Sequence, residues 1–411
     1  MRAYERLLKY VCIPTSSDEH SSGVPTSACQ FELARLVARE LREMGLSNVR
    51  VDDKCYVYAC LPATPGYEEA PKIGFIAHLD TSPDFNGENV HPRIIRNYDG
   101  GNVELGSSGR TLSVAAFPHL SRLRGRTLIV TDGTSLLGAD DKAGISEIMT
   151  MLERVIASGK PHGQVSVGFT PDEEVGAGAD HFDIAGFGAQ YAYTVDGGEE
   201  GEVVFENFNA SAATFSIRGF NIHPGSAKGT MVNAQLLAME INSMLPLHQT
   251  PRDTENYEGF YHLHAMEGNV EHATLHYIVR DHSSELFAER EARLRRIADE
   301  MNLRYGDGTV ELTIREQYRN MREMILPCYH VVETALEATR EQGIRPIICP
   351  IRGGTDGARL SYMGLPCPNL GTGGYAFHGP YEHITAEGMD IQTDILCGIV
   401  RRYAGMKPER V

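Results

Sequence analysis

One stretch near the middle of the chain constrains the fold most: Thr131 to Gly144, which reads T-D-G-T-S-L-L-G-A-D-D-K-A-G. It follows a β-branched run at 127–130 and precedes residues 145–155, where apolar side chains recur at helical spacing. The order predicts a strand, a glycine-containing loop and then a helix. Two adjacent acids, Asp140 and Asp141, lie in that loop or at the start of the helix. Free N–H groups at a helix start attract one acid as a cap, whereas two adjacent acids suggest a shared cation.

The rest of the pattern is that of an α/β protein. Continuous apolar runs at 73–77, 165–170 and 191–195 have the composition of strands buried on both faces of a mostly parallel sheet. The strand at 127–130 is expected to resume this sheet after a polar loop from 81 to 109. Further strands are expected at 49–51, 56–61, 346–349 and 368–370, and helices at 3–11, 27–44, 145–155, 329–342, 358–363 and 386–403.

The pattern changes between 208 and 320. Strand and helix signals there follow the order β-α-β-β-α-β, which is that of a ferredoxin-like unit. We therefore predict a discontinuous catalytic domain, 1–207 with 321–411, built on a doubly wound, mostly parallel sheet. An inserted ferredoxin-like α+β domain would occupy 208–320.

Polar side chains follow the predicted core strands. They are His78, Asp80, Asp140, Glu173, Glu174 and Asp196, and His378 lies in a later glycine-rich loop. Any one of these residues is weak evidence, because H-x-D, D-D and E-E occur in ordinary turns and caps. Ligands of open α/β sheets bind at the carboxyl ends of strands, so it is the joint placement that indicates a site.

Two imidazoles and three carboxylates suffice for two divalent ions that share one carboxylate, with the ions ~3.5–4 Å apart. Zinc is the first choice for mixed nitrogen and oxygen ligands, with manganese or cobalt as alternatives. Asp80 has the spacing to orient the imidazole of His78. Of the adjacent Glu173 and Glu174, one could bind metal while the other accepts a proton.

Composition excludes some classes of function. The formal net charge of -17 over 411 residues argues against a nucleic-acid-binding surface. No apolar run approaches the ~18 residues of a membrane span, and no signal peptide is evident. The 8 cysteines contain no C-x-x-C pair, which is typical of reduced thiols. We therefore expect a cytoplasmic protein that binds neither nucleic acid nor membrane.

Several motifs together resemble the co-catalytic dinuclear zinc peptidase family. They are His78-Leu79-Asp80, Gly138-Ala139-Asp140-Asp141-Lys142-Ala143-Gly144, Pro171-Asp172-Glu173-Glu174-Val175-Gly176, Val195-Asp196-Gly197-Gly198, Asn207-Phe208-Asn209-Ala210, His223-Pro224-Gly225, Tyr277-Ile278-Val279-Arg280-Asp281, Arg352-Gly353-Gly354-Thr355-Asp356-Gly357 and His378-Gly379. The resemblance covers essentially the whole chain. It is closer to the tripeptide aminopeptidases of that family than to its carboxypeptidases or desuccinylases.

The resemblance implies a role for each site residue. Asp140 would bridge two zinc ions, His78 and Asp196 would complete one site, and Glu174 and His378 would complete the other. Asp80 would orient His78, and Glu173 would be the general base. The peptide bond between Asp140 and Asp141 is often cis in such enzymes.

The resemblance also implies that the inserted domain is a lid and dimerisation domain. His223 would reach the active site, either its own or that of a partner subunit in a homodimer, and stabilise the developing oxyanion. Arg280 and Arg352 would hold the terminal carboxylate of a short peptide substrate.

Other interpretations stay open. One is an N-acyl amino acid amidohydrolase or a dipeptidase that uses the same metal site, and another is a metal- or peptide-binding protein without catalysis. His383 suggests a second metal assignment but is interpreted as a surface loop residue. The histidines at 262, 264, 272 and 276 are interpreted as solvated strand faces of the inserted domain.

Overall fold

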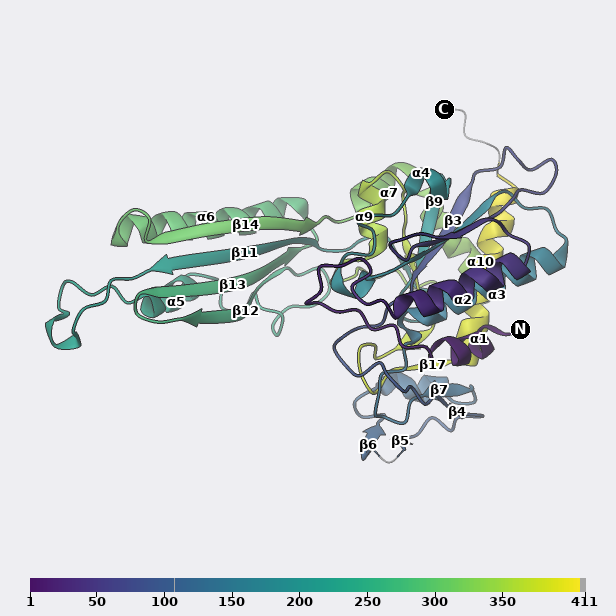
Figure 1. The fold of residues 1–411 in the computed structure, drawn as a ribbon, viewed down its shortest axis with the longest axis horizontal. Coiled ribbons are helices and arrows are strands. Elements are labelled where there is room, and N and C mark those ends of the chain that lie inside the picture. The colour runs from purple at the N-terminus through teal and green to yellow at the C-terminus, as the bar shows by residue number, and fades with distance from the viewer. Residues whose placement is uncertain (107, 407–411) are drawn as a thin grey trace. The chain divides into compact units, whose positions relative to one another are not determined.

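The computed structural model describes residues 1–106 and 108–406. These residues divide into two compact units, labelled by element in Figure 1. The first unit contains Met1–Phe205, Glu323–Cys349 and Thr355–Val411, and the second contains Glu206–Arg322 and Pro350–Gly354. The second unit therefore includes Arg352, which lies outside the predicted inserted segment.

The described part of the first unit is built on a seven-stranded sheet. Its order is β1 (Ser47–Val51), β2 (Val57–Leu61), β8 (Val165–Thr170), β3 (Ile73–His78), β9 (Tyr191–Val195), β15 (Asn369–Leu370) and β10 (Val203–Val204). Strands β8, β3, β9 and β15 run parallel, whereas β1, β2 and β10 join antiparallel. The sheet is thus mixed, and the prediction of a mostly parallel sheet holds only for its centre.

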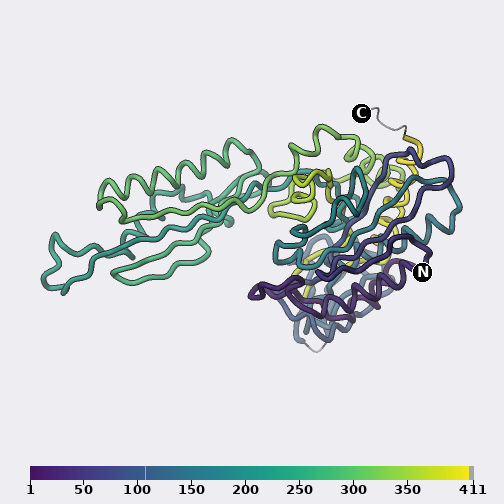
Figure 2. Tube along the Cα trace, turned by 45° about the horizontal axis from the view of Figure 1, so that its top comes forward, coloured from purple at the N-terminus to yellow at the C-terminus, as the bar shows by residue number. Residues whose placement is uncertain are grey.

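Helices cover both faces of this sheet. They are α1 (Ala3–Tyr10), α2 (Gln30–Glu43), α3 (Ala139–Ser158), α4 (Ile184–Phe187), α8 (His330–Glu341), α9 (Asp356–Tyr362) and α10 (Ala386–Ala404), with the short α7 (Arg322–Ile325) at the boundary between the units. Phe75 of β3 stacks on Tyr193, whose hydroxyl contacts Tyr403 of α10. The next residue, Ile76, packs on the opposite face with residues of α4 and α9. Figure 2 shows α10, in yellow, among much earlier segments of the unit.

The strand at 127–130 does not resume the main sheet, contrary to the prediction. It forms β7 (Leu128–Val130) in a separate sheet with the order β16 (Gly374–Tyr375), β17 (His383–Thr385), β7 and β4 (Arg93–Ile95). The predicted loop at 81–109 contains β4 and β5 (Val103–Leu105), and β5 pairs with β6 (Arg110–Leu112). The strand predicted at 346–349 is only a single bridge from Ile347 to Glu202. Apolar runs indicate strands but do not specify their partners.

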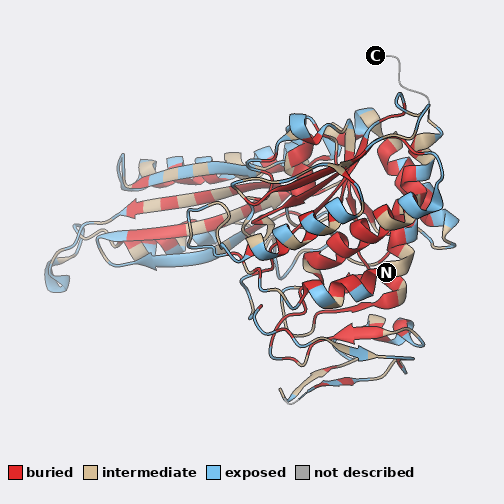
Figure 3. Ribbon diagram, turned by 45° about the vertical axis from the view of Figure 1, so that its right-hand side comes forward, coloured by how far each residue is buried: buried red, intermediate tan, exposed pale blue. Residues whose placement is uncertain are grey.

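The second unit follows the chain order β11 (Asn209–Arg218), α5 (Ala234–Ser243), β12 (Phe260–Gly268), β13 (His272–Asp281), α6 (Ser284–Tyr305) and β14 (Val310–Tyr318). Its strands form an antiparallel sheet with the order β12-β13-β11-β14. Phe215, Leu275 and Leu294 belong to its core, which joins one face of the sheet to α5 and α6. Figure 3 shows the resulting alternation of buried and partly buried residues along β11 and β13. The sequence of elements is the one expected of a ferredoxin-like unit.

Helix α3 begins at Ala139, earlier than the predicted start near 145. Gly138, at φ 76, supplies the left-handed conformation that precedes the helix. Asp140 and Asp141 have non-helical backbone angles, and the peptide bond between them is cis. Among the described residues, no helix is both long and apolar enough to cross a membrane.

The close packing of α3 on β9 leads to a first prediction. A Cβ atom at Gly144 would lie 1.9 Å from the carbonyl oxygen of Val195 and 2.5 Å from Asp141 Oδ1. Gly144→Ala should therefore lower the free energy of unfolding by about 3 kcal/mol or more, measured by denaturant titration. Gly405→Ala is the control, because a Cβ there meets only ordinary contacts. Equal stability of the two variants would contradict this packing.

Candidate metal centre

The predicted metal-binding side chains of the first unit converge at one edge of its sheet. His78 is the last residue of β3, Asp196 follows β9, and Glu173 and Glu174 lie in a 3-10 turn (Glu173–Val175) after β8. These three strands are adjacent and parallel, so their carboxyl ends meet. Asp140 arrives from the start of α3 rather than from a fourth strand of this sheet.

The carboxylate of Asp140 faces two different histidines. Its Oδ1 lies 3.0 Å from Nε2 of His78, and its Oδ2 lies 3.3 Å from Nε2 of His378. His378 Nε2 is also 2.9 Å from Glu174 Oε2, and His78 Nε2 is 3.7 Å from Asp196 Oδ1. Ligands on a tetrahedral ion with bonds of 2.0–2.1 Å are separated by about 3.3 Å. The spacings are therefore those of two ligand groups that share Asp140.

Without bound cations, negative charge exceeds positive charge at this site. Burial raises the pKa of Glu174 to about 7 and that of Asp196 to about 6, and the charge of Asp140 adds to both shifts. Hydrogen bonds to Asp140 and Glu174 raise the pKa of the His378 imidazole to about 11. Glu174 Oε1 is buried without a hydrogen-bond partner. Clustered carboxylates and imidazoles with an unsatisfied buried oxygen fit divalent cations, which would supply the missing positive charge.

Asp141 has a different environment from its neighbour. Its Oδ2 accepts from the backbone N–H of His78 at 3.1 Å, and its Oδ1 accepts from that of Gly144 at 3.2 Å. The carboxylate thus ties the end of β3 to the start of α3. Although Asp141 lies close enough to His78 and Asp196 to form a possible metal group, its bonds to the main chain favour Asp140 as the shared ligand.

Asp80 connects the strand that ends at His78 to the turn that carries the two glutamates. His78 Nδ1 lies 3.0 Å from the main-chain oxygen of Asp80 and 3.3 Å from its Oδ1. The same carboxylate accepts from the backbone N–H groups of Glu173 and Glu174, at 3.0 and 3.1 Å. Burial, and then the charge of Asp196, raise the pKa of Glu173 well above its usual range.

Sequence reasoning missed Glu382, which holds the loop before Asp140. Its buried carboxylate accepts from the backbone N–H groups of Leu137, Gly138 and Asp140, at 2.7, 2.8 and 2.9 Å. No spacing signal could reveal this role, because the partners are main-chain groups more than 200 residues earlier, such as Asp140, 242 positions away.

Removal of this carboxylate should damage both the fold and the site. Glu382→Ala would leave three N–H groups without their acceptor, at roughly 1–3 kcal/mol each. We expect an unfolding free energy lower by at least about 3 kcal/mol and weaker metal binding, measured by denaturant titration and metal analysis. Glu382→Gln, which keeps one acceptor oxygen, should be affected less. Wild-type stability and metal binding in the alanine variant would contradict this role of Glu382.

The three predicted substrate-binding residues all lie in the second unit. His223 is exposed, and its Nδ1 accepts from the backbone N–H of Gly225 at 3.1 Å. Arg280 donates through Nη1 to the carbonyl oxygens of Ser211 and Val279, and its guanidinium lies over the ring of Tyr318.

The guanidinium of Arg352 makes more contacts than that of Arg280. Its Nη1 donates to the carbonyl oxygens of Asn256 and Glu258, both at 2.8 Å, and its Nη2 donates to the hydroxyl of Thr254 at 2.9 Å. The guanidinium also lies over the rings of Phe208 and Phe260. Arg352 therefore anchors the 254–258 segment within the second unit.

His383 is not the surface loop residue that the sequence suggested. It is fully buried in β17, its Nδ1 donates to the carbonyl oxygen of Tyr381, and its ring stacks on those of His119 and Tyr375. Burial lowers its pKa to about 4, so it is a neutral core residue. The exposed residues His262, His264 and His272 lie on strands of the second unit, as predicted, together with the partly buried His276.

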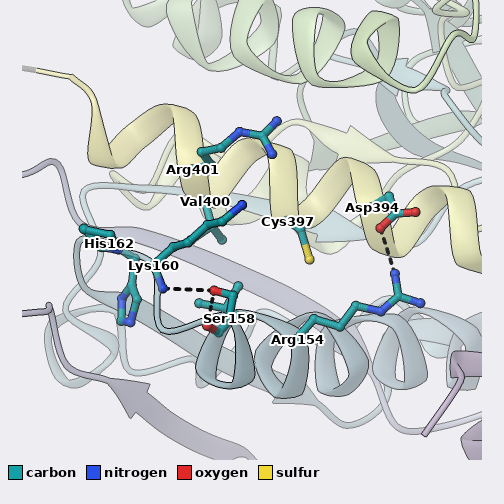
Figure 4. Close-up of a pocket in the computed structure, with 10 residues that line it drawn as sticks. Arg154, Ser158, Lys160, His162, Asp394, Cys397, Val400 and Arg401 are labelled. Atoms are coloured by element: carbon teal, nitrogen blue, oxygen red, sulfur yellow. Dashed lines mark hydrogen bonds and ion pairs between the residues drawn. The ribbon is translucent and has the colours of Figure 1, made fainter.

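A separate cavity of about 200 Å³ lies between the end of α3 and α10 (Figure 4). Arg154, Lys160, His162 and Cys397 are among the residues that line it. Arg154 is paired with Asp394. None of its lining residues is a predicted site residue, so this cavity does not compete with the strand-end cluster.

Comparison with known proteins decides the family. Residues 136–402 match the family model described as Peptidase family M20/M25/M40. The chain belongs to this family. It is 52% identical to a protein named Peptidase T from Clostridium perfringens over 404 residues, which is 98% of this chain and 99% of that protein. The family and this relative confirm the predicted family resemblance and the prediction of a hydrolase, a peptidase.

Two solved structures share the fold. A tripeptidase from Staphylococcus aureus matches with a TM-score of 0.79 at 22% identity, covering 98% of each chain. A Bacillus subtilis protein, described as a dinuclear metal binding peptidase from the M20 family, matches with a TM-score of 0.66 at 15% identity, covering 98% of this chain and 99% of that one. At these identities the likeness establishes the fold, an α/β architecture with a large mixed sheet.

Proposed function

We propose that this M20-family peptidase is a dinuclear metal aminopeptidase that removes the N-terminal residue of short peptides, foremost tripeptides. The observation that carries the proposal is the carboxylate of Asp140, whose two oxygens face two different imidazoles. The names of the relatives support the substrate class. Zinc is the metal that best suits this set of ligands, with manganese or cobalt as alternatives.

Each ion would have its own group of ligands beside the shared Asp140. His78 and Asp196 would bind one ion, and Glu174 and His378 would bind the other. Asp80 would fix the orientation of His78, since both its main-chain and carboxylate oxygens lie near Nδ1. When bound, two such ions would polarise the scissile carbonyl group and lower the pKa of the attacking water.

Glu173 would then move the proton. It lies in the same turn as Glu174 but would not bind metal, so its carboxylate could accept the proton of the attacking water and pass it to the leaving amine.

The second unit would supply the substrate contacts. His223, exposed on its surface, would donate a hydrogen bond to the oxyanion that forms during attack. Arg280 would hold the substrate carboxylate, because a planar guanidinium matches a carboxylate with two parallel N–H groups. Arg352 would share that role only by exchanging its bonds to the 254–258 segment.

The second unit would also act as a lid and as the contact in a homodimer. Leu236 and Met239 share one face of α5 and are 61% and 60% exposed, a pattern that indicates protein contacts.

We predict a dimer by light scattering, and a monomer for the double variant Leu236→Asp with Met239→Asp. Ile156→Asp, in the first unit, is the control. A wild-type monomer with full activity would rule out action of His223 across subunits.

The reaction would take place in the cytoplasm, where thiols stay reduced. All eight cysteines are reduced thiols in the structure.

Metal removal tests the proposal. Dialysis against a chelator should abolish hydrolysis of an unblocked tripeptide, and activity should return as about two equivalents of zinc or manganese are added back. Undiminished hydrolysis by protein shown to be metal-free would contradict it.

A further inference from the structure

We propose that Asp356 and Arg359 of α9 are positioning residues for the proposed general base, Glu173, because they fasten both ends of the loop that carries it. The proposal rests on the proposed function for its consequence in catalysis. The restraint that these two residues place on the loop can be measured without any assay of activity. Neither residue lies among the proposed metal ligands.

The loop in question, 171–180, leaves β8 after Thr170 and contains Glu173 and Glu174. Its entry is fixed by Asp356 at the start of α9. Thr170 donates its hydroxyl proton to Asp356 Oδ2 at 2.7 Å, and both groups are buried. The same carboxylate packs against the far part of the loop, since a Cβ atom at Gly178 would lie 2.4 Å from both of its oxygens. One side chain thus contacts the loop before and after the glutamates.

Arg359, less than one turn further along α9, fixes the exit of the loop. Its Nη1 donates to the carbonyl oxygen of Gly176 at 2.6 Å, and its Nη2 forms an ion pair with Asp180. Gly176 in turn donates its N–H to the carbonyl oxygen of Glu173 at 2.7 Å. The chain of bonds therefore runs from the guanidinium through Gly176 to the main chain of Glu173.

The middle of the loop is held from the other side. The carboxylate of Asp80 accepts from the N–H groups of Glu173 and Glu174. Thr26 and Gln30 also donate to the carboxylate of Asp172. Tyr56 donates to the carbonyl oxygen of Gly178. Helix α9 adds restraints at Thr170, Gly176 and Asp180, on both sides of the glutamates. Displacement of a catalytic group by about 1 Å can cost ~10²-fold in rate, so this fastening would matter to turnover more than to folding.

Arg359→Ala is the first test, because the side chain is 34% exposed and its loss should leave the core intact. At saturating metal we expect kcat for an unblocked tripeptide to fall by roughly tenfold or more, with KM and the unfolding midpoint unchanged. Arg359→Lys should recover part of kcat, since a lysine can still donate to Gly176 and pair with Asp180. Arg402→Ala is the matched control, a partly exposed arginine paired with Glu337 and Glu341 on α8.

Hydrogen exchange tests the fastening independently of the proposed function. Peptides that cover 172–180 should exchange faster in Arg359→Ala than in the wild type or Arg402→Ala. Gly178→Ala, whose Cβ would press on Asp356, should show the same increase, whereas Gly23→Ala, which has ordinary room, should not. Unchanged exchange in both loop variants would overturn the proposal even if the enzyme proved inactive on tripeptides. Faster exchange with wild-type kcat would overturn the link to Glu173.

Discussion

Glu173→Gln should reduce kcat for an unblocked tripeptide by roughly 10³-fold, because general-base catalysis contributes ~10²–10⁴-fold and the amide cannot accept the proton. The side chain keeps its size, and Glu173 is not among the proposed ligands. Metal content, KM and the unfolding midpoint should therefore match those of the wild type. Metal analysis and steady-state kinetics on the same preparation check this result.

Glu199→Gln is the control for this substitution, since Glu199 is a partly exposed carboxylate paired with Arg122. Its kcat should remain at the wild-type level. Retention of more than about a tenth of wild-type kcat by Glu173→Gln would exclude Glu173 as the base, given the usual size of that contribution. Loss of metal from the variant would instead make Glu173 a ligand.

Asp140→Asn should remove at least one of the two ions and nearly all activity. The amide nitrogen cannot bind a cation, so one of the two facing sites would lose its shared ligand. Without metal the variant should be less stable than the wild type at neutral pH, because hydrogen bonds from His378 and His78 outweigh burial and hold the pKa of Asp140 below its usual range.

Asp141→Asn is the informative counterpart. Its carboxylate accepts from two main-chain N–H groups, one with each oxygen, and the amide can replace only one acceptor. We expect a loss of about 1–3 kcal/mol in stability for this variant, with metal still bound in the folded protein. If Asp141→Asn lost metal while Asp140→Asn kept it, the shared ligand would be Asp141.

The sequence made the strand-end placement of His78, Glu174 and Asp196 predictable, because continuous apolar runs mark buried strands and the next polar residue marks their carboxyl ends. Asp140 was identified as a candidate ligand because it stands next to a second acid, Asp141, in a glycine-containing segment. Its position opposite His378 depends on a fold contact 238 residues apart, and only the resemblance to a family suggested it.

Other features could not be read from local patterns. The run at 128–130 has the composition of a core strand, yet its partners are β17 and β4 in a separate sheet, because apolar composition carries no information about pairing. His383 looked like a solvated loop residue because its burial comes from stacking on His119, a residue distant in sequence. Arg352 stood in a glycine-rich turn, and only the fold assigns it to the second unit.

The most direct test of the account is hydrolysis by the metal-loaded protein of one unblocked tripeptide, its N-acetylated form and its C-terminal amide, with products identified by mass spectrometry. The account predicts cleavage of the unblocked tripeptide alone, with release of its first residue. Preference for the N-acetylated form would contradict aminopeptidase action and favour an amidohydrolase of N-acyl amino acids at the same metal site.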